Sequence, residues 1–122
     1  MMFGLRAIQV FSNRGGMDIP HKVYDMVIRG GTMVCAEIPL TAESTRRAFI
    51  GVYPLNNPGT FNVRYFEVDR YLIEINDDLG ESSLLNQEWY RNVTADELWI
   101  ILSKWLDDFN DLVQPYRNDY PI

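Results

Sequence analysis

The chain has 122 residues, a formal net charge of −6 and a hydrophobic fraction of 47%. This length and composition are typical of one globular domain with its own core, so we expect residues 1–122 to form a single domain. Its acids are unevenly spread, because residues 67–122 hold thirteen Asp/Glu against four Lys/Arg, whereas residues 1–66 hold four against seven. The acidic half argues against a nucleic-acid-binding protein, which needs a basic surface, and is compatible with a basic protein partner.

Membrane insertion and secretion are not expected either. No apolar stretch approaches the ~20 residues that a membrane-spanning helix needs. Arg6 interrupts the apolar run at the N-terminus, which lacks the pattern of a secretory leader. The one cysteine, Cys35, cannot form a disulfide within the chain and lies in the apolar run TMVCAEIPL. We therefore expect a buried, reduced thiol and a cytoplasmic protein.

The first elements along the chain are a strand and a short helix. Residues 4–12 (GLRAIQVFS) contain strand formers, and two glycines follow soon after. Residues 18–31 (DIPHKVYDMVIRGG) then predict a short helix, because Pro20 suits a first helical turn and Gly30 can take the left-handed conformation that ends a helix. Val, Tyr and Ile also favour strands, so a strand over residues 22–29 stays open as the alternative.

Strands follow in quick succession after this helix. Polar turns such as NNPG at residues 56–59 separate several of them, so we expect neighbouring strands to pair antiparallel. In two of them apolar residues alternate with polar ones, which is the pattern of a strand with one buried face. The predicted strands comprise residues 32–39, 46–55, 61–68 and 70–76, with residues 84–92 (LLNQEWYRN) as a further short strand at an edge of the sheet.

A long helix is the clearest element in the sequence. Thr94 and Glu97 have the spacing of a capping box, in which each side chain bonds the backbone N–H of the other residue. Apolar residues then recur at helical spacing on one face: Leu98, Ile101, Leu102, Trp105, Phe109 and Leu112. We predict a helix from Thr94 to Val113, ended by Pro115, and a tail of residues 115–122 that is frayed or lightly docked.

The order of these elements predicts an α+β fold. We expect an antiparallel sheet of five to six strands, with the long C-terminal helix packed on one face and the short helix after the first strand. The apolar stripe of the long helix is the cover that one face of such a sheet needs.

The residues for common catalytic and metal chemistry are few. The chain has one histidine, His21, and one cysteine, so it cannot assemble a zinc site of the usual Cys/His type. Neither glycine pair has phosphate-binding spacing, and no serine lies in a nucleophile elbow. We therefore expect no catalytic residue, no metal and no cofactor, and a protein that is not an enzyme.

Acids gather in residues 71–83 (YLIEINDDLGESS), where Glu74, Asp77, Asp78 and Glu81 lie within eight residues. The adjacent aspartates do not fit a calcium loop of the EF-hand type, which places its ligands at alternate positions. The stretch is therefore either a solvated turn or an electrostatic contact surface for a basic protein.

Two further groups are candidates for a partner-binding surface. Asp107, Asp108 and Asp111 fall near the end of the predicted long helix, where the helix dipole disfavours acids, which hints at another role for them. Trp89 and Tyr90 stand in a polar stretch, as the aromatic anchors of protein interfaces do. Packing of Trp89 in the core beneath the helix is the alternative.

Three stretches carry a resemblance to a known family. They are GGTMVCAEI after the short helix, NNPGTFNVRYFEV as a turn and strand, and NVTADELWIILSKWLDDF as the capped closing helix. In their order the chain resembles the small immunity proteins of bacterial polymorphic-toxin and contact-dependent inhibition systems. The resemblance implies a cytoplasmic domain that binds and neutralises a cognate toxin, often a nuclease with a basic active-site surface, and it carries over no catalytic residues.

These observations together favour a non-enzymatic protein-binding domain, in its most specific form an immunity protein with an acidic contact surface. Two alternatives stay open. One is a small ligand-binding or enzymatic domain with a pocket between sheet and helix. The other is a structural subunit that forms a homodimer through an edge strand, for which residues 84–92 are the candidate.

Overall fold

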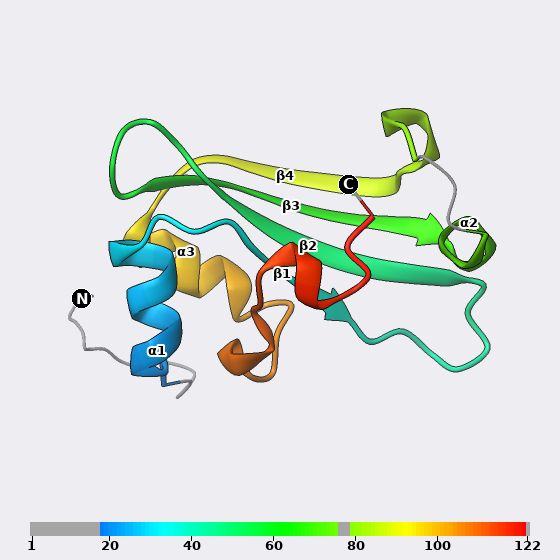
Figure 1. Ribbon diagram of the computed structural model, residues 1–122, viewed down its shortest axis with the longest axis horizontal. Helices are drawn as coiled ribbons and strands as arrows, with labels where there is room; N and C mark the ends of the chain where they lie inside the picture. The colour runs from blue at the N-terminus through cyan, green and yellow to red at the C-terminus, as the bar shows by residue number, and fades with distance from the viewer. Residues whose placement is uncertain (1–17, 76–78, 122) are drawn as a thin grey trace.

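The computed structural model describes residues 18–75 and 79–121. The predicted strand at residues 4–12 lies outside this range. The described residues form an α+β fold with one antiparallel sheet in the order β1-β2-β3-β4, so the predicted class and strand direction are confirmed (Figure 1). The strands are β1 (Val34–Ile38), β2 (Arg46–Pro54), β3 (Thr60–Asp69) and β4 (Leu85–Thr94).

The sheet is a meander, in which each strand pairs with the next one in sequence. The turn between β2 and β3 is the predicted NNPG, and Gly59 takes a φ of +81°, which favours glycine. The hydroxyl of Thr60 donates a hydrogen bond of 2.6 Å to the carbonyl of Asn57 and closes the turn. This turn fixes the register that pairs Pro54 with Phe61.

Both faces of this sheet are buried. On the first face, apolar side chains from all four strands pack with buried residues of α1 (His21–Tyr24), the π-helical turn η2 (Asp25–Arg29) and α3 (Ala95–Leu102). Helices α1 and α3 lie at the same end of the sheet (Figure 1), where the rings of Tyr24 and Trp99 stack. This first-face cluster is the larger of the two cores.

A smaller cluster buries the second face. It contains Cys35, Phe49, Phe66 and Val68 from three strands, and Tyr120 from the C-terminal segment packs over them. The Tyr120 ring meets those of Phe49 and Phe66 at centroid distances of 5.8 and 5.6 Å, in steep edge-on contacts that suit aromatic quadrupoles.

The C-terminal segment links the two faces. After η4 (Phe109–Asp111), Val113 exchanges two backbone hydrogen bonds with Cys35, of 2.8 and 2.9 Å, and so pairs with the outer edge of β1. The chain then passes through η5 (Pro115–Arg117) to the second face, where Tyr120 is buried. The described part of the tail is therefore docked through an aromatic side chain.

The prediction of a long helix from Thr94 to Val113 is wrong. Helix α3 ends at Leu102, although the capping box at its start is present as predicted. Beyond Leu102 the chain turns, so Phe109 and Leu112 reach the first-face cluster from η4 and the residue after it rather than from one continuous helix.

Asp108 explains why no continuous helix runs through residues 108–111. Carboxylates near a helix C-terminus are unfavourable, because the last carbonyl groups there carry partial negative charge. Asp108 instead takes an extended conformation, and its carboxylate accepts a hydrogen bond of 2.9 Å from the backbone N–H of Asn110. The acid therefore caps η4, and it marks the boundary between two helical segments.

The prediction of five to six strands is also wrong, since the described residues contain four. Residues 70–74, expected within a strand, form the short helix α2 (Arg70–Glu74). In a helix the adjacent Leu72 and Ile73 both pack against the second-face cluster, whereas a strand would direct them to opposite faces. The edge strand predicted over residues 84–92 is present as β4.

Residues 21–29 are helical, which decides between the two alternatives for that stretch. Val23 and Val27 lie one helical turn apart, and both are buried in the first-face cluster. The left-handed residue that follows is Gly31, with a φ of +59°, and not Gly30 as expected.

We expect Thr94→Ala to lower the free energy of unfolding by about 1 kcal/mol, because it removes the N-cap of α3. In the capping box, Thr94 Oγ1 accepts a bond of 3.4 Å from the N–H of Glu97, whose carboxylate accepts one of 3.0 Å from the N–H of Thr94. Urea denaturation monitors the change. Thr94→Ser keeps the hydroxyl and should stay near the wild type, so equal losses in both variants would rule out the capping explanation.

We expect Gly51→Ala to destabilise the fold by about 1–3 kcal/mol through overpacking. A Cβ atom at this buried glycine would overlap the hydroxyl of Tyr120 and approach that of Tyr53 to 2.9 Å. Gly80→Ala is the matched control, because a Cβ there meets no atom within 4 Å. In urea denaturation, adding Tyr120→Phe should reduce the loss caused by Gly51→Ala, and strictly additive losses would contradict the proposed clash.

Candidate functional site

A buried arginine organises the second face near β4. Arg64 of β3 is 6% exposed, and one of its terminal nitrogens donates to both carboxylate oxygens of Glu81 at 3.0 Å. The other terminal nitrogen donates to the hydroxyl of Tyr53 at 3.3 Å. Three aromatic rings surround the guanidinium, with centroids 4.7 Å (Trp89), 5.3 Å (Phe66) and 5.8 Å (Tyr53) from its Cζ.

This environment keeps Arg64 charged. Burial by itself would lower the pKa of the guanidinium, but the hydrogen bonds to Tyr53 and Glu81 outweigh it and raise that pKa above its usual value. The carboxylate of Glu81 is largely exposed, while the arginine it contacts is buried. Glu81 therefore neutralises a buried charge and is not free to act as a simple surface acid.

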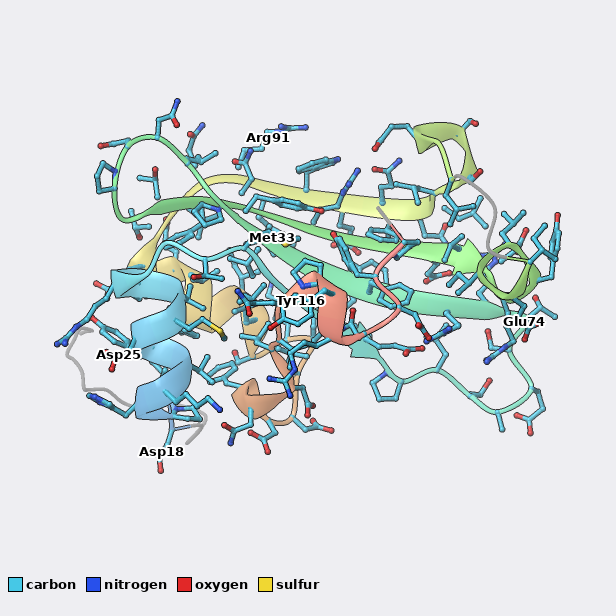
Figure 2. All side chains as sticks on the ribbon, in the orientation of Figure 1. Asp18, Asp25, Met33, Glu74, Arg91 and Tyr116 are labelled. Atoms are coloured by element: carbon cyan, nitrogen blue, oxygen red, sulfur yellow. The ribbon has the colours of Figure 1, made fainter. Side chains whose placement is uncertain are left out.

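Trp89 lies at the border between this cluster and solvent. It pairs directly with Arg64 across β3 and β4, and it is 38% exposed. Its ring is flanked by two guanidinium groups, since the Cζ of Arg91 is 4.2 Å from the ring centroid and that of Arg64 is 4.7 Å away. Figure 2 shows Arg91 on the outer side of β4. The indole is thus held between cations, with part of its surface left open.

Tyr90 projects to the opposite face of β4. Its hydroxyl donates to the carboxylate of Glu88 at 3.0 Å, and the Nζ of Lys104 lies 5.7 Å from its ring centroid. Each face of this edge strand therefore carries an aromatic ring with a cation against it. The neighbouring Trp89 and Tyr90 belong to the same strand but not to one patch.

The two edges of the sheet differ in their protection. Val113 pairs with the outer edge of β1, whereas β4 has only β3 as a strand partner among the described residues. Register shifts relative to β3 interrupt β4 near both of its ends, and Asn86 and Asn92 take positive φ values of 51° and 54° there. The regular part of the open edge is therefore confined to residues 87–91.

The acids of residues 71–83 do not form one described patch. Glu74 is exposed on α2, Glu81 is bound to Arg64, and Asp77 and Asp78 lie outside the described residues. Figure 2 shows Glu74 at one end of the molecule, away from the turns that follow α3. Glu74 is therefore separate from the second acidic group.

That second group surrounds α3 and η4. Residues 94–113 contain five acids and one lysine, and all five carboxylate-bearing residues are exposed: Asp96, Glu97, Asp107, Asp108 and Asp111. Ile100, one helical turn after the first two of these, is 54% exposed. We call residues 96–111 the acidic segment. It combines exposed charge with an exposed apolar side chain.

The groups with catalytic potential lie apart. His21 is exposed on α1 and its Nε2 is 3.0 Å from the carboxylate of Asp25. Cys35 lies in the second-face cluster, on the other side of the sheet, where burial raises the pKa of its thiol to about 11. No three His, Cys, Asp or Glu side chains within residues 18–75 and 79–121 are grouped to hold a metal ion.

An open depression lies at one end of the sheet rather than between the sheet and α3. Residues of the 40–46 loop and Glu67 line it. Burial alone would raise the pKa of Glu67, but hydrogen bonds from Tyr65, Asn86 and Arg46 lower it, so the carboxylate is already satisfied within the chain.

Sequence reasoning identified the edge strand and Trp89, but it missed Arg64, Tyr53 and Tyr120. The signal for Arg64 was present in the strand alternation, because it shares a face with Phe66 and Val68. A strand that is apolar on both faces has to be buried on both, so a charge within it needs a partner. Sequence spacing did not identify Glu81 as that partner.

Comparisons with known proteins leave the family open. No family model, curated protein or solved structure matches this chain. Among the described residues, no helix is both long enough and apolar enough to cross a bilayer.

We expect Glu81→Ala to lower the free energy of unfolding by about 1–2 kcal/mol, because it leaves the buried guanidinium of Arg64 without its counter-ion. Glu74→Ala removes an exposed acid of the same type and should change stability by no more than about 0.5 kcal/mol. Chemical denaturation of both variants gives the comparison. Equal, small changes would show that Arg64 does not depend on Glu81.

Proposed function

We propose that this chain is a non-enzymatic protein-binding domain that contacts a basic partner through the acidic segment. The observation that carries the proposal is the group of exposed carboxylates around the exposed Ile100. None of the carboxylates of the acidic segment forms an ion pair with a residue that the structure describes. Unpaired acids of one sign provide an electrostatic field, and an apolar side chain among them provides area to bury.

The exposed acids and Ile100 would contribute to binding in different ways. Exposed ion pairs contribute roughly 0.2–1 kcal/mol each, so the acids mainly set the association rate and the choice of partner. Full burial of an isoleucine side chain contributes about 1.5–3 kcal/mol, and because Ile100 is 54% exposed, covering it would contribute roughly half of that, at least as much as a typical single ion pair. Asp108 is bound to its own η4 turn, which leaves Asp107 and Asp111 as the freer contacts in that part of the segment.

The most specific form of this proposal is an immunity protein that neutralises a cognate toxin in the cytoplasm. The support for it is the resemblance in element order to such proteins, together with an acidic surface that suits a toxin with a basic active site, such as a nuclease. The test takes as the candidate toxin any large protein that is encoded next to this chain. Its C-terminal domain is expressed in a host cell, and growth is measured with and without this chain. Toxicity that this chain does not relieve would contradict the immunity role.

The contact surface itself is tested by Asp107→Asn combined with Asp111→Asn. We expect the pair to slow association with the basic partner by about 2- to 30-fold and to flatten its salt dependence, because two of the attracting charges are lost. Stopped-flow binding at several salt concentrations measures both effects. Ile100→Ala should instead raise the dissociation rate.

Asp18→Asn combined with Glu43→Gln is the matched control, since it removes two exposed acids outside the acidic segment. A separate Glu74→Gln variant tests the acid on α2. If the control pair slows association as much as the test pair does, net charge rather than the acidic segment governs binding, and the proposed surface is wrong.

A further inference from the structure

We propose that a second copy of this chain adds to the open edge of β4, so that two four-stranded sheets join into one. This proposal does not depend on the function proposed above, because it uses none of the carboxylates of the acidic segment, and Lys104 is the one residue of that segment that takes part. It rests on three observations, namely one sheet edge that is open among the described residues, a bounded regular stretch within it, and side chains that complement themselves across a two-fold axis.

The open edge gives the position. A strand at a sheet edge leaves one row of backbone N–H and C=O groups available for another strand. Val113 occupies the outer edge of β1, but no described residue pairs with the outer side of β4. A partner strand would therefore add at β4. Because the described residues of each chain offer one such edge, addition of a second copy closes the assembly at two.

The two register shifts in β4 limit the length of the strand that a second copy can pair with. Its register relative to β3 shifts between residues 85 and 88 and again between residues 90 and 93. Regular pairing is therefore confined to residues 87–91, whose centre is Trp89. A symmetric antiparallel pair of these stretches places its two-fold axis at Trp89, because that register alone uses all five residues of both copies.

In this register, complementary side chains of the two copies lie opposite each other on the same face of the joined sheet. A two-fold axis that is perpendicular to the joined sheet and passes beside Trp89 places Trp89 opposite Trp89 of the second copy. Because opposed residues of antiparallel strands point to the same face, the two indoles lie on one face of the sheet. On the other face, Glu88 lies opposite Tyr90 of the second copy. Cross-strand aromatic pairs contribute to strand pairing, and the Arg91 guanidinium already packs on the indole, with its Cζ 4.2 Å from the ring centroid.

Charge complementarity favours the same arrangement. The Nζ of Lys104 lies against the Tyr90 ring, on the face toward which Glu88 projects. In the two-fold register, Glu88 of one copy comes opposite Tyr90 of the other and so approaches its Lys104. This pair of opposite charges occurs twice in the dimer. Within one chain, neither Glu88 nor Lys104 has an ion-pair partner among the described residues.

A charge exchange between two variants provides the test. Glu88→Lys places like charges at both contacts of its own homodimer, and Lys104→Glu does the same with acids. We expect each variant alone to have a dimer dissociation constant at least tenfold above that of the wild type in sedimentation equilibrium. An equimolar mixture should recover dimerisation, because in the mixed dimer both contacts again join opposite charges.

Recovery in the mixture also shows that the single variants are folded, and circular dichroism checks this separately. Glu74→Lys makes the same charge change on α2, away from this edge, and it should leave the dimer dissociation constant near that of the wild type. A second measurement needs no substitution: hydrogen exchange of those amides of residues 87–91 that face away from β3 should slow in the wild type as concentration rises through the dissociation constant.

Three results would overturn the proposal. They are a wild-type monomer at all concentrations up to about 500 μM, a dimer that neither charge variant weakens, and a mixture that stays monomeric. None of these results affects the association assay for the acidic segment, so failure of the dimer is distinguishable from failure of the proposed function.

Discussion

The burial of the Arg64 guanidinium among aromatic rings is the interaction on which the second face of the sheet depends. An arginine in a strand that is buried on both sides needs hydrogen bonds and a counter-ion, because an unpaired charge there would be strongly unfavourable. Tyr53 and Glu81 meet this need at the two terminal nitrogens, whereas the buried Nε has no hydrogen-bond partner among the described residues. Trp89 and Phe66 pack against the guanidinium. The path of the chain between β3 and β4 is constrained by the same contact, since it must bring Glu81 back over β3. One charged side chain thus links a strand centre, a connecting turn and the exposed edge.

The elements that local chemistry specifies were predictable from the sequence. The capping box at Thr94, the turn at NNPG and the edge position of residues 84–92 each rest on a few neighbouring residues, and all three are present. The length of the last helix was not predictable in this way. Apolar residues at helical spacing continue past Leu102, but Asp108 makes a local hydrogen bond that a continuous helix would not allow.

On the second face of the sheet, contacts between residues far apart in the sequence decide the local structure. Residues 71–75 alternate like a strand, yet they form a helix because both Leu72 and Ile73 contact the same cluster. Tyr120 covers that cluster from a segment far along the chain, and Gly51 leaves the space that its hydroxyl needs. Such contacts join distant positions, so no local pattern indicates them. The candidate site divides along the same line. The sequence predicted Trp89 as a contact residue, which stays a prediction, but it did not indicate the arginine that packs against Trp89 or the role of Glu81.

The pairing of Val113 with Cys35 has a consequence for the order of events during synthesis. The outer edge of β1 forms early in the chain, but the residue that covers it comes near the C-terminus. Until that residue has left the ribosome, β1 presents an unpaired edge, and Phe49 and Phe66 lack the ring that packs over them. A nascent chain that ends before residue 113 therefore exposes both a strand edge and an aromatic surface, which are the features that chaperones and aggregation both recognise. The sheet edge and the second-face cluster are thus complete only after Val113 and Tyr120 have been synthesised.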